Sequence, residues 1–218
     1  LLASCKGRGD VQLNVGDYCL YTLAPAPYFT GTAVARGLQE HLEPTFIPSL
    51  EEGDKMGFEE RIEAGFRLAL KHRLDLFYGL SSILVAIGER FAKGSGGVKF
   101  TMDMLHPRLL FRVLRGLIIS KLQRRSMLPR DLWKLKGIVA GGMDTAFYRD
   151  AIEALWGKKP LEGYGGTELG GIALQTWNYK GMTFLPDCNF LEFIPEKDFF
   201  DSLSNNGRSS GRPNGQPR

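Results

Sequence analysis

The stretch that decides the fold is LKGIVAGGMDTAFYRDAIEALWG, residues 135–157. Its first part, 135–142, joins small and β-branched apolar residues to two glycines, which predicts a strand that ends in a turn. The second part, 144–157, predicts a helix that Asp144 caps and Gly157 ends. The apolar residues predicted to form one stripe on that helix are Phe147, Ala151, Ala154 and Leu155. A strand that turns through two glycines into a helix is the repeating unit of an α/β fold.

Strand and helix patterns alternate on both sides of this stretch. The predicted upstream elements are a strand at 17–23, a helix at 31–43, a short strand or extended link at 44–49, a helix at 58–73, a strand at 74–80 and a helix at 81–93. Downstream, the predicted elements are a strand that runs from 160 into a glycine loop and two strands around a turn at 182–196. We therefore expect an α/β fold with a mixed, largely parallel sheet flanked by helices.

The last residues differ in composition from the rest. Leu203 is the one apolar side chain in 201–218, where Gly, Ser, Asn, Arg and Pro supply nearly everything else. Such a stretch buries too little surface to offset the entropy lost on ordering it. We expect residues 1–200 to form the folded part and residues 201–218 to be a disordered or foreign tail.

Two glycine-rich loops follow predicted strands, AGGMD at 140–144 and GYGGTE at 163–168. In parallel sheets, loops at the carboxyl ends of strands hold the ligand. Glycines let backbone N–H groups reach a ligand, and the helix N-terminus after the first loop favours an anion. Thr167 offers a hydroxyl to a phosphate oxygen, Glu168 can hold Mg²⁺, and Tyr164 offers a flat face to a base. Together these features predict a nucleotide monophosphate site, whereas each alone is also common as a plain turn or helix start.

The composition limits the classes of function. The formal charge of +4 and the pI of about 9.0 fit an anionic ligand but fall short of a polybasic, nucleic-acid-binding composition. The three cysteines are widely spaced and form no CxxC, which argues against a disulfide framework or a zinc site and fits a reducing, cytoplasmic compartment: Cys5, Cys19 and Cys188. No apolar run has transmembrane length, so we expect no membrane span.

GYGGTE resembles the Tyr-Gly-x-Thr-Glu motif of the adenylate-forming superfamily, which includes acyl-CoA synthetases, luciferases and peptide-synthetase adenylation domains. The strand–Gly-Gly–helix stretch GIVAGGMDTAFYRDAIEALWG resembles the unit upstream of that motif in the family. LFYGLSSILVAIGERF is similar to the family's G-x-P-S-x-L segment, with Ser81 where the proline often stands. LPDCNFLEFIPE is similar to the corresponding region of auxin-responsive acyl-acid amido synthetases, so the resemblance is closest to that branch and to the phenylacetate-CoA-ligase-like branch.

The resemblance implies that the full protein activates a carboxylic acid with ATP and Mg²⁺ as an acyl-adenylate. The acyl group would then pass to coenzyme A or to an amino acid, and this chain would be part of the large N-terminal domain. The resemblance also assigns a role to each matching residue: adenine and acyl contact for Ala140, Gly141 and Gly142; cofactor contact for Tyr164, Gly165 and Gly166; α-phosphate contact for Thr167; Mg²⁺ coordination for Glu168; and the border of the acyl pocket for Ser81 and Ser82.

Other parts of the family pattern are not found in the sequence. These are the Ser/Thr/Gly-rich phosphate loop with its lysine, the later ribose-binding Asp, the hinge, and the small C-terminal domain with its catalytic Lys. We therefore expect the chain to be the middle of such an enzyme and to be inactive alone.

Two other functions stay open. One is a regulatory nucleotide-binding module without catalysis. The other is a basic helical surface, because residues 104–130 contain seven Lys or Arg and no acid. Such a surface binds a membrane or a nucleic acid. The competing structural interpretation is a solvated helix face whose apolar side packs on the sheet.

Overall fold

The computed structural model describes residues 2–23, 29–93, 107–142, 144–166, 168–187 and 190–209. The chain divides into two units, Leu1–Leu185 and Pro186–Arg218. The first unit contains the sheet, and the second contains the helix α8 (Glu196–Ser209). Residues 94–97, Thr167 and Cys188 are among those that lie outside the described ranges.

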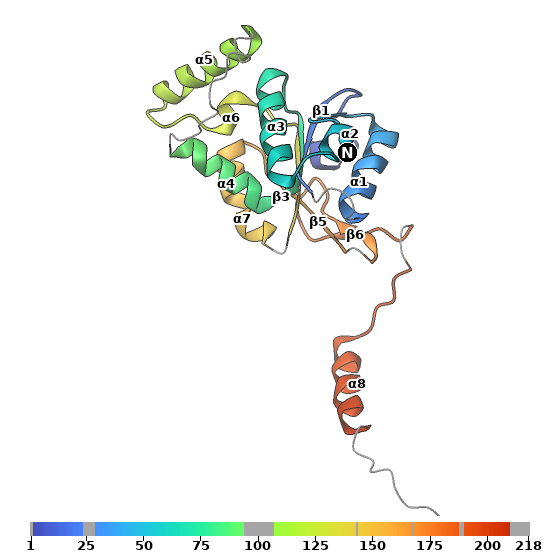
Figure 1. Cartoon of the computed structure of the whole chain (residues 1–218). Coiled ribbons are helices and arrows are strands. Elements are labelled where there is room, and N and C mark those ends of the chain that lie inside the picture. Colours follow the sequence, from blue (N-terminus) through green and yellow to red (C-terminus); the bar gives the residue numbers. More distant parts are fainter. Residues whose placement is uncertain are drawn as a thin grey trace, which may run out of the picture. The chain divides into compact units, whose positions relative to one another are not determined.

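A seven-stranded sheet forms the centre of the first unit (Figure 1), in the order β2-β1-β3-β4-β5-β6-β7. Its strands are β1 (Tyr18–Tyr21), β2 (Thr45–Phe46), β3 (Leu76–Leu80), β4 (Gly137–Gly141), β5 (Leu161–Gly166), β6 (Gly170–Leu174) and β7 (Thr183–Phe184). The first five run parallel, whereas β6 and β7 are each antiparallel to the strand before them. The expected α/β fold with a mixed, largely parallel sheet is therefore confirmed.

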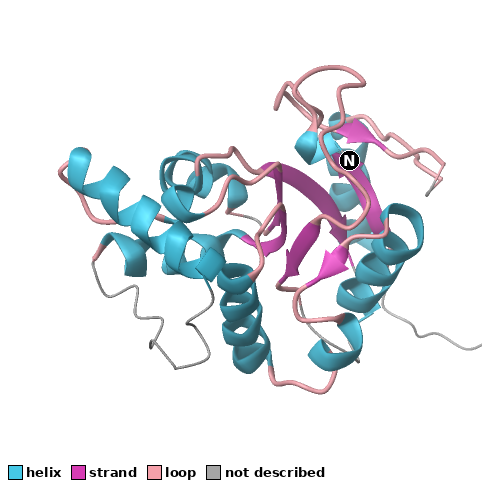
Figure 2. Ribbon diagram, turned by 90° about the horizontal axis from the view of Figure 1, so that it is seen from above, coloured by secondary structure: helices cyan, strands magenta, loops and turns pink. Residues whose placement is uncertain are grey.

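Helices cover both faces of this sheet (Figure 2). They are α1 (Phe29–Leu42), α2 (Leu50–Gly53), α3 (Phe58–Lys71), α4 (Ser81–Ala92), α5 (Pro107–Leu122), α6 (Pro129–Leu132) and α7 (Thr145–Trp156), after a short 3₁₀ helix η1 (Leu2–Ser4). Alternation along β1 separates two apolar clusters, because successive side chains of a strand point to opposite faces. Leu20 belongs to the larger cluster, which also contains buried residues of α3, α4 and α7. Cys19 and Tyr21 belong to the smaller cluster, together with Ala35 of α1. No helix within the described ranges is long and apolar enough to cross a membrane.

Two buried tryptophans hold the larger cluster together. The indole rings of Trp133 and Trp156 stack with their centroids 5.9 Å apart. The Trp133 indole N–H donates to the carbonyl of Ala69 in α3, and the Trp156 indole N–H donates to the carbonyl of Leu84 in α4, each at 2.9 Å. Each ring thus buries a large apolar surface without leaving its polar atom unpaired.

The helix predicted at 144–157 is confirmed as α7, and its expected stop at Gly157 adopts a left-handed conformation with φ of 72°. Asp144 stands at the N-cap, but its side chain makes no capping hydrogen bond. The predicted apolar stripe is wrong, because Phe147 is 87% exposed and Ala151 and Ala154 are also exposed. The residues that α7 buries are Thr145, Ile152 and Trp156.

The C-terminal predictions are only partly correct. Of the two strands expected in 182–196, β7 forms but residues 190–195 form no strand. Helix α8 covers residues 201–209, where the composition predicted disorder. Glu196 and Asp198 lie in its first turn, where carboxylates interact favourably with the helix dipole. Residues 210–218 lie outside the described residues, and a foreign origin of the tail stays a prediction.

Candidate nucleotide site at the carboxyl edge of the sheet

The register of the parallel strands brings the two predicted loops to one edge of the sheet. Leu80 at the end of β3 pairs with Gly141 of β4, and Ala140 of β4 pairs with Glu162 of β5. Because parallel strands end at the same edge, the turn at Gly142 lies next to the strand that carries the second glycine loop.

The three residues predicted in the first loop differ in what they offer to a ligand. Ala140 is 1% exposed and belongs to the core, so its side chain is unavailable at the surface. A Cβ added at Gly141 would meet no atom within 4 Å, so open space lies beside its backbone. Gly142 has a φ of +127°, a conformation that favours glycine because it carries no Cβ. The turn therefore presents bare backbone at Gly141 and Gly142.

Ser81 is buried rather than exposed in an acyl pocket. Its hydroxyl lies 2.7 Å from the hydroxyl of Thr145 at the start of α7, and Thr145 also donates to the carbonyl of Gly142 at 3.1 Å. This chain of hydrogen bonds joins the end of β3 to the turn after β4. Ser82, one residue along, is exposed. Contact of either serine with an acyl group stays a prediction.

Thr145, whose hydroxyl donates to the carbonyl of Gly142, is a residue that the sequence analysis did not identify. The signal that was present is its place directly after the predicted N-cap Asp144. At that place a hydroxyl can bond a carbonyl three residues back.

The second glycine loop has a structural reason for its glycines. Strands β5 and β6 form a hairpin in which Tyr164 pairs with Ala173, and the register shifts between Tyr164 and Gly165. A Cβ at Gly165 would lie 2.3 Å from the carbonyl oxygen of Gly170. The backbone at Gly165 is therefore in close contact with the opposite strand. At Gly166, an added Cβ would lie 3.6 Å from a carboxylate oxygen of Glu168.

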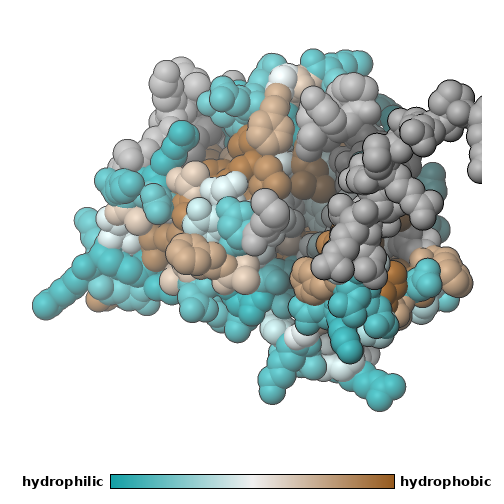
Figure 3. Space-filling view, turned by 90° about the horizontal axis from the view of Figure 1, so that it is seen from below, coloured by the Kyte–Doolittle hydropathy of each residue, from teal (hydrophilic) through white to brown (hydrophobic). Residues whose placement is uncertain are grey.

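The hairpin leaves the predicted contact groups accessible. Tyr164 is 58% exposed and Glu168 is also exposed. Among the described residues no three His, Cys, Asp or Glu side chains gather at one point. Mg²⁺ needs only one or two protein carboxylates when substrate phosphates supply further oxygens, and the exposed Glu168 is a candidate for one of them. Seen from below the view of Figure 1, apolar side chains gather in a hollow in the middle of the first unit (Figure 3).

An ion pair fixes α7 against β5 beside the site. Arg149 of α7 pairs with Glu162 of β5, and their side chains are 21% and 13% exposed. The backbone N–H of Glu162 donates to the side-chain oxygen of Gln175 at 3.1 Å. Among the described residues the Nε of Arg149 is buried without a hydrogen-bond partner. The pair therefore adds to the core packing of Ile152 and Trp156 in holding α7, whose N-terminus follows the Gly142 turn.

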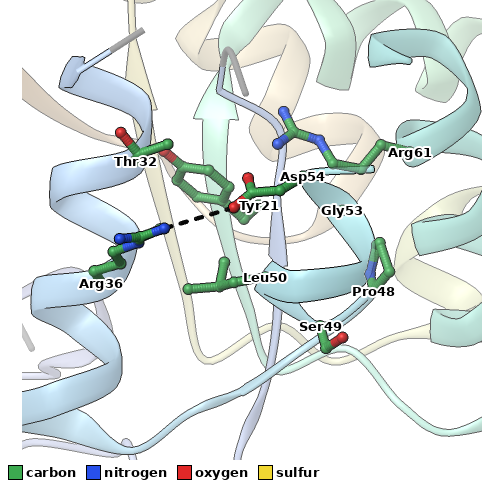
Figure 4. A pocket seen from close by; sticks show the side chains of 10 residues that line it. Tyr21, Thr32, Arg36, Pro48, Ser49, Leu50, Gly53, Asp54 and Arg61 are labelled. Carbon is green, nitrogen blue, oxygen red and sulfur yellow. Dashed lines mark ion pairs between the residues drawn. The ribbon is translucent and has the colours of Figure 1, made fainter. Parts of the chain in front are cut away.

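Two pockets among the described residues lie away from the glycine loops. One, of about 20 Å³, lies between β1, α1, α2 and α3, and there Arg36 pairs with Asp54 at 3.8 Å near Tyr21 and Arg61 (Figure 4). Burial raises the pKa of the Tyr21 phenol and lowers the pKa of the Arg61 guanidinium. A volume of this size holds about one water molecule, so it does not fit a nucleotide. The other, of about 170 Å³, includes Asp17 at the amino end of β1, the opposite edge from the glycine loops.

Comparison with known proteins defines the fold. No protein-family model matches the chain, and no curated protein matches it. Among solved structures, the chain is similar to an open conformation of 2-hydroxyisobutyryl-CoA ligase in complex with 2-HIB-AMP and CoA, with a TM-score of 0.52 and 15% identity over 80% of this chain and 33% of that chain.

Weaker likenesses are to apo MatB from Rhodopseudomonas palustris and to an ATP-bound RpMatB–BxBclM chimera. The first has a TM-score of 0.44 at 16% identity and covers 80% of this chain and 26% of that one. The second has a TM-score of 0.42 at 16% identity and covers 78% of this chain and 25% of that one. The likeness to 2-hydroxyisobutyryl-CoA ligase shows that the chain has the α/β fold of one part of that enzyme, and the chain spans about a third of that enzyme's length.

Proposed function

We propose that this chain supplies the AMP-binding edge of an enzyme that activates a carboxylic acid with ATP as an acyl-adenylate. The observation that carries the proposal is the register of β3, β4 and β5, which aligns the open backbone at Gly141 with the strand bearing Tyr164. The likeness to a ligase that binds an acyl-AMP supports it at the level of fold.

In the proposed reaction, a carboxylate oxygen attacks the α-phosphorus of ATP and pyrophosphate leaves. Both reactants are anions, so catalysis depends on positioning them and on neutralising their charge. The backbone at Gly141 and Gly142 would line the adenine and acyl side of the site. The hydroxyl of Thr167 would contact the α-phosphate, and the ring of Tyr164 would stack on the adenine. Glu168 would hold Mg²⁺, which neutralises phosphate charge when it is bound.

The acceptor of the acyl group is coenzyme A or an amino acid in this proposal. The chain spans a third of the ligase it is similar to, so the whole reaction is assigned to a longer protein.

Titration of the chain with AMP tests the site directly. Gly141→Ala is the sharpest variant, because its Cβ would meet no atom of the described residues within 4 Å yet would stand where the ligand is proposed to approach. We expect it to weaken AMP binding roughly tenfold or more while leaving the unfolding free energy within about 0.5 kcal/mol. Gly171→Ala is the matched control, since its Cβ would meet Leu185 at an ordinary 3.6 Å. Equal AMP affinity in Gly141→Ala and the unchanged chain contradicts the proposed site.

A second pair of variants separates base stacking from metal binding. Tyr164→Ala removes a stacking surface, which is worth about 1–3 kcal/mol per base, so AMP and ATP binding should weaken alike. Glu168→Gln should weaken ATP binding in the presence of Mg²⁺ and leave AMP binding without Mg²⁺ unchanged.

The alternative function, a nucleotide-binding module without catalysis, makes a different prediction for turnover. A longer protein that contains this chain should catalyse acid-dependent ATP–pyrophosphate exchange if the enzyme proposal is correct. AMP binding together with no exchange across a broad panel of carboxylic acids favours the module.

A further inference from the structure

The outer face of α5 is apolar along its whole length. Six large apolar side chains are exposed there: Leu110 (47%), Phe111 (72%), Leu114 (52%), Leu117 (41%), Ile118 (59%) and Leu122 (79%). Their spacing of three and four residues places them on one side of the helix. The opposite side packs on the protein through Leu109, Gly116 and Ser120. The expectation that the apolar residues of 104–130 pack on the sheet is therefore wrong for these six.

The inner side of α5 is firmly attached. The Arg112 guanidinium donates to the backbone carbonyls of Ala69, Leu70 and His72 at the end of α3, at 3.2, 2.6 and 2.6 Å. Arg125, just beyond the helix, forms two hydrogen bonds of 2.7 Å with the carboxylate of Asp131. These contacts fix which side of α5 faces outward. Figures 1 and 2 both show α5 at the outer end of the first unit.

Positive charge flanks the apolar face. Arg108, Arg115 and Lys121 of α5 and Arg124 just beyond it are exposed, and no ion pair joins them to a carboxylate of the described residues. Between 104 and 130 the chain contains no acid. A second copy of this face would bring like charges together, which is unfavourable. A polyanion alone would leave the six apolar side chains in water.

We propose that the outer face of α5 binds an anionic lipid membrane at its interface. The apolar side chains would enter the boundary between headgroups and acyl chains, and the flanking arginines and lysine would contact anionic headgroups. The helix lies in the membrane plane and does not cross it. This proposal is independent of the nucleotide site, which lies at the carboxyl edge of the sheet.

Co-sedimentation of the full chain with vesicles tests the proposal. Vesicles of phosphatidylcholine with phosphatidylserine should bind the chain at low salt, and vesicles of phosphatidylcholine alone should bind it much more weakly. Leu114→Ser with Ile118→Ser should reduce binding about tenfold or more, because the exposed apolar area is lost. Arg108→Ala with Arg115→Ala should reduce binding to anionic vesicles about thirtyfold, at roughly 1 kcal/mol per basic residue near the surface.

Val15→Ser is the matched control, since Val15 is 74% exposed but lies on the loop before β1. The Val15→Ser variant should bind anionic vesicles as strongly as the unchanged chain does. Far-ultraviolet circular dichroism should show that every variant is folded. No binding of the folded chain to anionic vesicles at low salt overturns the proposal. So does a dimer in sedimentation velocity that Leu114→Ser with Ile118→Ser dissociates, because that result assigns the face to a second copy. Binding to vesicles or nucleic acid that falls with salt but is unchanged in the Leu114→Ser, Ile118→Ser variant also overturns it.

Discussion

The hydroxyl groups of Ser81 and Thr145 form a buried hydrogen bond between the first residues of two different helices, 2.7 Å long and 64 residues apart in sequence. Both side chains are 2% exposed. This bond connects the end of β3 to the turn after β4, so it helps to hold in place the backbone proposed to line the nucleotide site.

Removing either hydroxyl should destabilise the fold. Ser81→Ala should lower the free energy of unfolding by about 1–2 kcal/mol, because a buried hydrogen bond is lost. Thr145→Val should cost more, since Thr145 also donates to Gly142. The double variant should cost less than the sum of the two, as expected for groups in contact. Urea unfolding measures all three, with the exposed Ser82→Ala as control; strictly additive losses would show that the two hydroxyls do not interact.

The β5–β6 hairpin should tolerate a methyl group at one glycine and reject it at another. Gly165→Ala forces a Cβ to within 2.3 Å of the Gly170 carbonyl, so the strands must separate and stability should fall by about 2 kcal/mol or more. Gly171→Ala meets only ordinary contact at 3.6 Å and should change stability by less than about 1 kcal/mol. Thermal unfolding of the two variants gives the comparison, and similar losses would contradict the hairpin geometry.

The order of the main strands and helices from β1 to β5 was predictable from sequence because local patterns set it, whereas α2, α6 and β6 were not predicted. The strand ending at Gly141 and the helix ending at Gly157 were both identified, since a glycine turn and a left-handed stop have local signatures. The buried face of α7 was not predicted correctly. Trp156 is buried because it stacks on Trp133 and donates to the carbonyl of Leu84, and both contacts are made by residues outside the helix.

The same distinction applies to the candidate site. The two loops were expected at matched strand ends, and the register of β3, β4 and β5 places them at one edge. The role of Gly165 could not be inferred, because the reason for a glycine there is the approach of Gly170 from the next strand. The link from Ser81 to Thr145 likewise depends on a tertiary contact between residues that no local pattern relates.

The amino edge of the sheet should depend on a buried carboxylate. Asp17 is 2% exposed, and its two oxygens pair with Arg73 at 3.1 Å and Lys136 at 2.6 Å. Asp17→Asn leaves Lys136 without its partner, while Arg73 keeps its pair with Asp75 at 2.7 Å, and the loss of the charged hydrogen bonds should cost about 1.5–3 kcal/mol. Glu89→Gln removes an exposed pair with Lys93 and should cost less than about 0.5 kcal/mol. Guanidinium unfolding measures both, and equal losses would show that burial of Asp17 contributes nothing.

A second buried carboxylate should make stability depend on pH. Burial by itself raises the pKa of Asp131, but hydrogen bonds from Arg125 and from the backbone N–H of Leu128 outweigh it and hold the pKa below the ordinary value of 3.8. Because the folded pKa is the lower one, the stabilisation is fully present above the unfolded value and is lost as pH falls through the folded value.

Asp131→Asn should therefore be less stable than the unchanged chain at neutral pH, and the difference should narrow as pH falls below about 4. Urea unfolding at a series of pH values measures the difference. Asp150→Asn, which removes an exposed carboxylate on α7, should stay within about 0.5 kcal/mol of the unchanged chain at neutral pH. A difference for Asp131→Asn that stays constant from neutral pH to about pH 2 would mean that the Arg125 pair does not hold the Asp131 carboxylate in its charged form.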